Sequence, residues 1–163
     1  MSHLDCAVIG GGPAGLFAAL SAAERARELG STIRVTVFER NSRAGRKLLV
    51  TGAGQCNITR EESASQLVDH YGDHGRFLRH ALYTFPPSLI LQRFESMGLP
   101  LVIREDRKVF PASFRASHVL HTLLDRCRAV GVQFSYESRI TRIARASDHF
   151  SLLSGDTVVA FSR

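Results

Sequence analysis

The sequence has few cysteines and no long apolar run. Its three cysteines, Cys6, Cys56 and Cys127, are widely spaced and form no Cys-x-x-Cys pair. An odd number at this spacing argues against a disulfide framework and against a structural zinc site. No apolar stretch is long enough for a membrane span, and the N-terminus does not have the pattern of a signal peptide. We therefore expect a cytoplasmic protein with no membrane partner.

The sequence also has no tract of basic residues, although its formal net charge is +6. Lys and Arg are scattered along the chain, which is typical of a solvated surface, so we predict no nucleic-acid partner. His70 and His74 are four residues apart, but Gly72 and Gly75 disfavour a helix that would join them. We expect a polar loop there and no metal site. The length of 163 residues suits a single domain.

A Gly-rich turn near the N-terminus is the most informative motif. An apolar run at 4–9, predicted to be a strand, leads directly into Gly10-Gly11-Gly12-Pro13-Ala14-Gly15. Residues 13–29 are rich in helix formers and end at Gly30, and a second apolar run covers 33–39. A Gly-x-Gly-x-x-Gly string between a strand and a helix is typical of a dinucleotide-binding βαβ unit.

Each position of the turn has an expected role. Gly10 permits a sharp turn in which a side chain would collide with the returning backbone, and Gly12 lets the main chain approach a pyrophosphate. Gly15 removes a Cβ where the helix packs on the sheet. Pro13 suits the first helical turn, because its missing N–H would have no partner there. The N–H groups at this end, Ala14 among them, would face the anion.

Glu39 ends the second apolar run and is the candidate ribose ligand. It lies 24 residues after Gly15, slightly more than the usual offset of about 20. A carboxylate there accepts hydrogen bonds from a ribose 2′-OH and repels a 2′-phosphate. We therefore expect FAD or NAD rather than NADP, with the adjacent Arg40 as the one feature that would favour a phosphate.

A second Gly-rich segment follows Glu39, between residues 41 and 60. Arg46 and Lys47 could meet the pyrophosphate charge, and Asn57 offers side-chain hydrogen bonds. Gly52 and Gly54 would let the backbone lie against a flat ring or a phosphate. The alternative is a surface loop with solvated cations, but long loops between regular elements are usually functional or disordered. We therefore expect this segment to contribute to the site.

The rest of the chain is predicted to mix helices with antiparallel strands. We expect helices at 63–71 and 76–83, and a third that begins at an N-cap, Ser88, and runs to 97. A hairpin is expected over 101–111, and a helix beginning near Ser117 has apolar residues at helical spacing. A strand at 132–136 and a three-stranded meander at 140–144, 149–153 and 157–161 complete the prediction.

These motifs resemble the N-terminal part of a bacterial flavoprotein family, the BaiN/RdsA-like, or aminoacetone-oxidase-like, NAD(P)/FAD-dependent oxidoreductases. The similar segments include GGGPAGL (10–16), FER (38–40), GRKLLVTGAGQCNIT (45–59), FESMGLPL (94–101), KVFPASFRAS (108–117) and LLDRCRAVGV (123–132). The resemblance covers nearly the whole chain, and the segment at 45–59 is its most specific part.

The resemblance implies an α/β fold: a Rossmann-like FAD-binding domain with a parallel central sheet, a helical insertion and an antiparallel meander. It also implies FAD as the bound nucleotide, with NAD(P)H as a candidate reductant. The residues implied along the cofactor are Gly10, Gly12, Gly15, Glu39, Arg40, Arg46, Lys47 and Asn57, and the backbone of Ile140 would contact adenine. Members of the family are more than twice as long, so we expect residues 1–163 to be a single, incomplete domain, truncated at its C-terminus.

No Ser/His/Asp set, paired carboxylates or redox cysteine pair is visible, so the sequence assigns no catalytic residue. Cys56 is expected to be a small packing residue. We predict the FAD-binding portion of an oxidoreductase that transfers hydride or electrons through the isoalloxazine, acting on an unidentified small molecule. The alternative is a non-catalytic dinucleotide-binding remnant or interaction module. A nucleic-acid-binding role, suggested by charge alone, ranks third.

Overall fold

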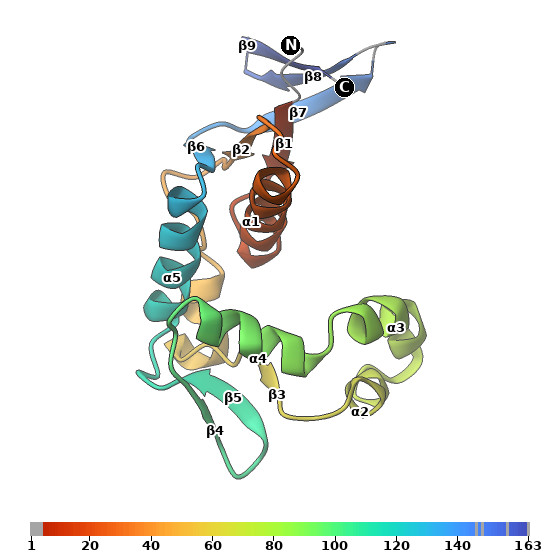
Figure 1. Ribbon diagram of the computed structural model, residues 1–163, viewed down its shortest axis with the longest axis vertical. Coiled ribbons are helices and arrows are strands. Elements are labelled where there is room, and N and C mark those ends of the chain that lie inside the picture. The colour runs from red at the N-terminus through yellow and green to blue at the C-terminus, as the bar shows by residue number, and fades with distance from the viewer. Residues whose placement is uncertain (1–4, 146, 148, 156, 163) are drawn as a thin grey trace. The chain divides into compact units, whose positions relative to one another are not determined.

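The computed structural model describes residues 5–145, 147, 149–155 and 157–162, which are arranged in two compact units (Figure 1). The first unit runs to Leu48 and resumes at Leu123, and the second is Leu49–Thr122. The single domain expected over 1–163 stays a prediction, because compact units are not always independent domains. Across the described helices, none has the length and hydropathy needed to cross a bilayer.

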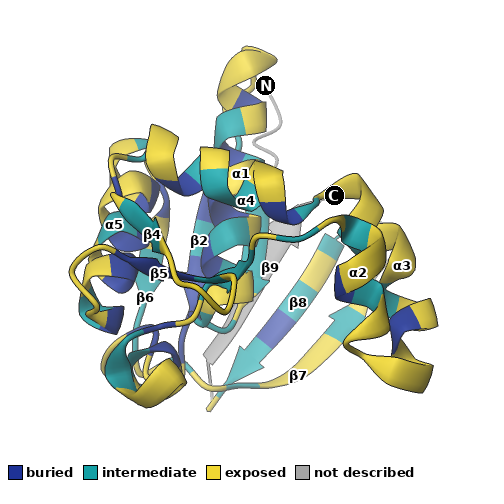
Figure 2. Cartoon of the chain, turned by 90° about the horizontal axis from the view of Figure 1, so that it is seen from below, coloured by how far each residue is buried: buried dark blue, intermediate teal, exposed yellow. Residues whose placement is uncertain are grey.

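A parallel sheet of three strands forms the centre of the first unit. Its order is β1 (Asp5–Ile9), β2 (Arg34–Phe38) and β6 (Gln133–Ser135). Ile9 is opposite Phe38, and Phe38 is opposite Ser135, so the three strands end at the same edge. β2 lies between the other two and is largely buried, as Figure 2 shows. The predicted parallel sheet is confirmed.

Helix α1 (Pro13–Glu28) makes the crossover that parallel pairing of β1 and β2 requires. Its buried residues form one apolar stripe: Leu16, Ala19, Leu20, Ala23 and Ala26. The helix ends as predicted, because Gly30 takes a φ of +64° and the next N–H, of Ser31, donates to the main-chain oxygen of Ala26 at 2.8 Å.

The end of helix α5 (Ala116–Ala129) belongs to the same unit and packs on α1. The Cys127 thiol is fully buried and donates to the main-chain oxygen of Leu16 at 3.5 Å. Nη2 of Arg126 lies 2.8 Å from Oε1 of Glu24. The apolar spacing predicted for α5 is confirmed, because Val119, Leu120, Leu123, Leu124 and Cys127 are all buried.

An antiparallel meander completes the first unit. It consists of β7 (Ile140–Arg145), β8 (His149–Ser154) and β9 (Thr157–Ser162), in that order, as predicted. Leu152 of β8 is buried with Phe38 of β2, and the half-buried side chains of Ala7 and Ile140 pack against this pair. The meander therefore shares an apolar cluster with the end of the parallel sheet.

The second unit combines short helices with a small antiparallel sheet of order β3-β5-β4. Its elements are the 3₁₀ segment Leu48–Gly54 apart from its first residue, a second 3₁₀ segment (Gly72–His74), β3 (Thr59–Arg60), α2 (Ala64–Asp69), α3 (Gly75–Thr84), α4 (Pro87–Ser96), β4 (Leu101–Ile103), β5 (Lys108–Pro111) and the start of α5. The predicted helical insertion and the hairpin are both confirmed.

The start of α4 differs from the prediction. Ser88 is not the N-cap: Pro86 holds that position, Pro87 is the first helical residue, and no side chain caps the end. The fixed φ of proline suits the first turn, and its lack of an N–H removes a donor that would have no partner there. The proline pair therefore begins the helix two residues before Ser88 would.

Candidate functional site

The turn after β1 has the backbone geometry that glycine favours. The N–H of Gly10 donates to the main-chain oxygen of Phe38 at 2.8 Å, which extends the pairing of β1 with β2 by one residue. Gly10 has a φ of +102°, yet a Cβ built on it meets no atom within 4 Å. The expected collision with the returning backbone is therefore absent, and the need for glycine comes from the dihedral angle alone.

Gly15 and Gly12 differ in the space around them. A Cβ on Gly15 would lie 1.9 Å from the main-chain oxygen of Gly10 and 3.4 Å from Cγ1 of Val8, so the expected close packing of helix on strand is present. A Cβ on Gly12 would meet nothing within 4 Å. Gly12 is also the N-cap of α1, and no side chain caps it. The first turn of α1 therefore has open space beside it and uncapped N–H groups.

Gly11 is a site residue that our sequence reasoning missed. It is buried, and its N–H donates to Oε2 of Glu39 at 2.8 Å. A Cβ there would lie 3.0 Å from Cβ of Ala44 and 3.1 Å from Oε2 of Glu39. The fingerprint leaves this position free, so the extra glycine between Gly10 and Gly12 was the one available signal.

The carboxylate of Glu39 is buried at the end of β2, with 7% of the residue exposed. Its Oε1 accepts from the main-chain N–H of Asn41 at 2.9 Å and from Nδ2 of the same residue at 2.5 Å. A carboxylate offers about four acceptor positions. With Gly11 on Oε2, three are used, and one is left for a further donor such as a hydroxyl. Asn41 was the second residue missed by the sequence reasoning.

The surroundings of Glu39 favour its ionised form. Burial raises the pKa of Glu39, but hydrogen bonds from Asn41 and Gly11, together with the positive charge of Arg40, outweigh it and hold the pKa below its ordinary value. A carboxylate that is ionised at neutral pH is an acceptor only. The Glu39 carboxylate can therefore accept hydrogen bonds from hydroxyl groups and would repel a nearby anion.

The basic residues Arg46 and Lys47 come directly after Gly45, which is hydrogen-bonded to the Gly-rich turn. The N–H of Gly45 donates to the main-chain oxygen of Gly11 at 2.8 Å. Nη1 of Arg46 donates to Oδ1 of Asn41 at 2.9 Å. The side chain of Lys47 is exposed and makes no hydrogen bond or ion pair within the part of the chain that the structure describes. The structure therefore links Arg46 to Glu39 through Asn41 and leaves the ammonium of Lys47 available.

The segment before Asn57 is a tight turn in the second unit. Gly52, Ala53, Gly54 and Cys56 all have positive φ, and the N–H of Cys56 donates to the main-chain oxygen of Thr51 at 3.0 Å. Asn57 itself is exposed. Because it belongs to a different unit from the Gly-rich turn, its place along a cofactor stays a prediction.

Cys56 and Ile140 both have packed side chains. Burial raises the pKa of the Cys56 thiol, and a hydrogen bond with Thr51 offsets only part of that rise. A buried thiol of raised pKa is a poor nucleophile. Ile140 begins β7 and packs against Phe38 and Leu152, so only its main chain could serve the adenine contact that the resemblance implies. That contact stays a prediction.

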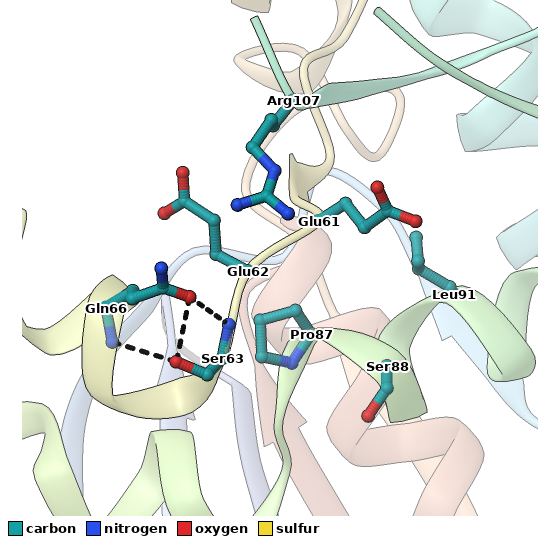
Figure 3. Close-up of a pocket in the computed structure, with 8 residues that line it drawn as sticks. All are labelled: Glu61, Glu62, Ser63, Gln66, Pro87, Ser88, Leu91 and Arg107. Atoms are coloured by element: carbon teal, nitrogen blue, oxygen red, sulfur yellow. Dashed lines mark hydrogen bonds between the residues drawn. The ribbon is translucent and has the colours of Figure 1, made fainter.

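A separate polar pocket of about 320 Å³ lies beside α2 and α4, and Figure 3 shows eight of the residues that line it. Within it Ser63 and Gln66 form a capping box, with Gln66 N–H to Ser63 Oγ at 3.2 Å and Ser63 N–H to Gln66 Oε1 at 3.0 Å. Glu62 is paired with Arg60 at 2.8 Å and with His70 at 2.6 Å. These groups hold the start and end of α2, so we assign them a structural role.

His70 and His74 belong to no cluster of metal-ligating side chains among the described residues. His70 follows the last residue of α2, and His74 lies in a 3₁₀ turn. Among the described residues there is no group of three or more His, Cys, Asp or Glu side chains that could hold an ion.

The chain is similar to one protein family and to several curated proteins. Residues 4–162 match the family model described as "HI0933-like protein Rossmann domain". The chain is 35% identical over 116 residues to a 3-dehydro-bile acid delta(4,6)-reductase of Clostridium scindens, covering 71% of this chain and 27% of the relative. It is 26% identical over 162 residues to a ribosomal RNA dihydrouridine synthase of Escherichia coli, covering 97% of this chain and 38% of the relative.

Solved structures agree on the fold. A 3-ketosteroid-delta4-(5alpha)-dehydrogenase from Rhodococcus jostii superposes with a TM-score of 0.65 at 14% identity, over 98% of this chain and 44% of that one. At this identity the match shows the Rossmann-like α/β fold, which confirms the predicted fold class. The chain spans between about a quarter and two fifths of the curated relatives named above. With the family model matching nearly every residue, the chain belongs to the HI0933-like family, whose Rossmann domain it contains.

Proposed function

We propose that this chain is the FAD-binding part of a flavin-dependent oxidoreductase, a single domain over residues 1–163. The hydrogen bond from the N–H of Gly11 to Oε2 of Glu39, at 2.8 Å, carries the proposal. This bond holds the Glu39 carboxylate, our candidate ribose ligand, directly beside the Gly-rich turn, our candidate phosphate site. The ribose and pyrophosphate of a dinucleotide are bonded to each other, so a site for both needs these two features to be adjacent.

The pyrophosphate would lie against the first turn of α1. The N–H groups and the positive end of the helix dipole favour an anion there, and the space beside Gly12 has room for it. Arg46 and Lys47 would add positive charge, Arg46 from a position fixed by Asn41. Gly10, Pro13, Ala14 and Gly15 would shape the main chain around the phosphates.

The ribose would use the acceptor position that remains on Glu39. The ionised carboxylate suits a 2′-OH and repels a 2′-phosphate, which supports FAD or NAD over NADP at this site. The family resemblance supports FAD, with NAD(P)H as the reductant. The resemblance also implies contacts to the cofactor from Asn57 and from the main chain of Ile140, and both stay predictions.

The bound flavin would supply the redox chemistry, accepting hydride and passing electrons to an acceptor. The residues of this chain would bind and orient it, and we assign none of them as an acid or base. One relative is named as a bile-acid reductase and the other as a dihydrouridine synthase. Because the chain covers only 27% and 38% of these two proteins, we propose a redox role without a substrate.

The test is to identify the cofactor directly. The chain is expressed with riboflavin, purified and heated, and the released nucleotide is identified by mass and fluorescence. We expect FAD in near-equimolar amount; NAD alone, or no nucleotide even after added FAD, would overturn the proposal. Glu39→Ala should weaken FAD binding by about 1–3 kcal/mol, the scale of a lost hydrogen bond to a charged group. Arg142→Gln, at an exposed position of β7, is the matched control and should bind as the parent does.

The alternative is a dinucleotide-binding module without catalysis. It predicts the same retained FAD but no reduction by NADH or NADPH under anaerobic conditions, whereas the oxidoreductase portion is expected to be reduced by one of them. We include a cytoplasmic location in the proposal, because Cys6, Cys56 and Cys127 are all free thiols, as is usual in a reducing compartment.

A further inference from the structure

Four side chains on one face of α3 line a shallow hollow of about 490 Å³ in the second unit. They are Arg76, Arg79, His80 and Tyr83, spaced by three, four and seven residues from the first. This spacing places side chains in a row along a helix. All four are exposed, and α3 contains no Asp or Glu. The hollow therefore concentrates positive charge beside an aromatic ring.

The cations of this hollow are free to bind a ligand. Neither Arg76 nor Arg79 forms an ion pair with a carboxylate within the described ranges. Cζ of Arg79 lies over the ring of Tyr83, 5.8 Å from its centroid, which is within the range of a cation–π contact. Tyr83 is 52% exposed, which leaves ring surface for a second planar group.

We propose that this face of α3 binds a nucleotide, by its phosphate on Arg76 and Arg79 and its base on Tyr83. Guanidinium groups form paired hydrogen bonds to phosphate oxygens, and aromatic rings and Arg planes are the usual stacking surfaces for bases. The imidazole of His80 supplies a further hydrogen-bond donor. The ligand is either a free nucleotide or a nucleotide within an RNA strand, because both present the same phosphate and base.

The composition of the hollow favours a nucleotide over a lipid headgroup. None of its four lining residues is aliphatic, so nothing in it would receive an acyl chain. Phe77, on the same helix, is 89% exposed and could enter a membrane surface, so vesicles form an arm of the test. The proposal runs against our expectation from composition, which rested on the absence of a basic tract in the sequence. It is independent of the flavin site.

The test measures two probes on the purified chain. Binding of radiolabelled AMP is followed by equilibrium dialysis, and binding of fluorescein-labelled oligouridylate by anisotropy over a range of KCl concentrations. The double variant Arg76→Gln with Arg79→Gln should weaken binding at least tenfold. For the strand it should also reduce the slope of log affinity against log salt by about 0.7, for the one phosphate that both guanidinium groups hold. Tyr83→Ala should weaken binding about fivefold or more without changing that slope.

The matched control removes the same charge from another exposed element. Arg142→Gln with Arg145→Gln, on β7, should change affinity less than twofold. Circular dichroism checks that each variant is folded. If both probes bind and both depend on α3, the site takes a free nucleotide; if only the strand binds and depends on α3, the site takes RNA. Either result supports the proposal. Equal loss in the control, no binding of either probe, or α3-dependent binding only to phosphatidylglycerol vesicles would overturn it. AMP binding lost in Glu39→Ala but kept in the α3 double variant would also overturn it, since the nucleotide would then be at the Gly-rich turn.

Discussion

The side-chain amide of Asn41 donates to Oε1 of Glu39 at 2.5 Å and accepts from Nη1 of Arg46 at 2.9 Å. A single side chain therefore joins the buried acid to the exposed guanidinium. This link fixes the carboxylate so that its other oxygen meets the N–H of Gly11. In the proposed site, Asn41 would position both the ribose ligand and one of the phosphate ligands without contacting the cofactor itself.

Asn41→Ala is therefore expected to weaken FAD binding by about 0.5–1.5 kcal/mol, the net value of one typical hydrogen bond. The main-chain N–H of residue 41 would still reach Oε1, so the loss should be smaller than for Glu39→Ala. Asn41→Asp should cause a larger loss at neutral pH, because a second carboxylate would face the first. Titration by flavin fluorescence measures all three; unchanged affinity in Asn41→Ala would show that Asn41 has no positioning role.

Two glycines of the turn should respond differently to added side chains. Gly12→Val should abolish FAD retention with little change in the melting temperature of the cofactor-free protein, because no atom beyond its chain neighbours lies within 4 Å of a Cβ there. Gly15→Ala should destabilise the fold, because its Cβ would lie 1.9 Å from the main-chain oxygen of Gly10, and such overpacking costs about 1–3 kcal/mol or more. Thermal melts and cofactor content separate the two effects. Retained FAD in Gly12→Val would contradict the role given to the turn.

The lowered pKa of Glu39 predicts a stability that depends on pH. A carboxyl whose pKa is lower in the folded state stabilises it fully above the pKa of the unfolded chain, and this contribution is lost as pH falls through the folded pKa. The loss therefore occurs below the ordinary value of 4.5. Urea unfolding between pH 7 and pH 3 should show the advantage of the parent over Glu39→Gln shrinking with acidification. A constant difference over this range would mean that the carboxylate is not stabilised by its neighbours.

The three cysteines should react slowly in the folded protein. Burial raises the pKa of Cys127 to about 11 and also raises the pKa of Cys56 and of Cys6. Since the thiolate is the reactive form, iodoacetamide at pH 8 should modify the half-buried Cys6 first and leave the two buried thiols until the protein unfolds. Peptide mass mapping measures the order. Rapid modification of native Cys56 would instead support a redox role for that residue.

The sequence predicted most elements because their signals are local. Helical spacing of apolar residues indicated α1 and α5, and Gly30 marked the end of α1 through its preference for positive φ. The start of α4 was predicted wrongly, since Ser88 and the Pro86-Pro87 pair are both acceptable initiators and local rules do not rank them. The collision expected at Gly10 was also wrong, because clearance depends on where the neighbouring chain runs.

By itself the sequence determined the order of these elements: a strand, a Gly-rich turn, a helix and a second strand that ends in an acid. Dihedral preferences and hydrophobic periodicity act within a few residues, so the sequence alone shows them. Tertiary structure alone decided which atoms the acid meets. Gly11 and Glu39 are 28 residues apart, and their hydrogen bond exists because parallel pairing brings Ile9 opposite Phe38. A hydrogen bond is directional and short-ranged, so its partners are fixed only when the register of the sheet is fixed.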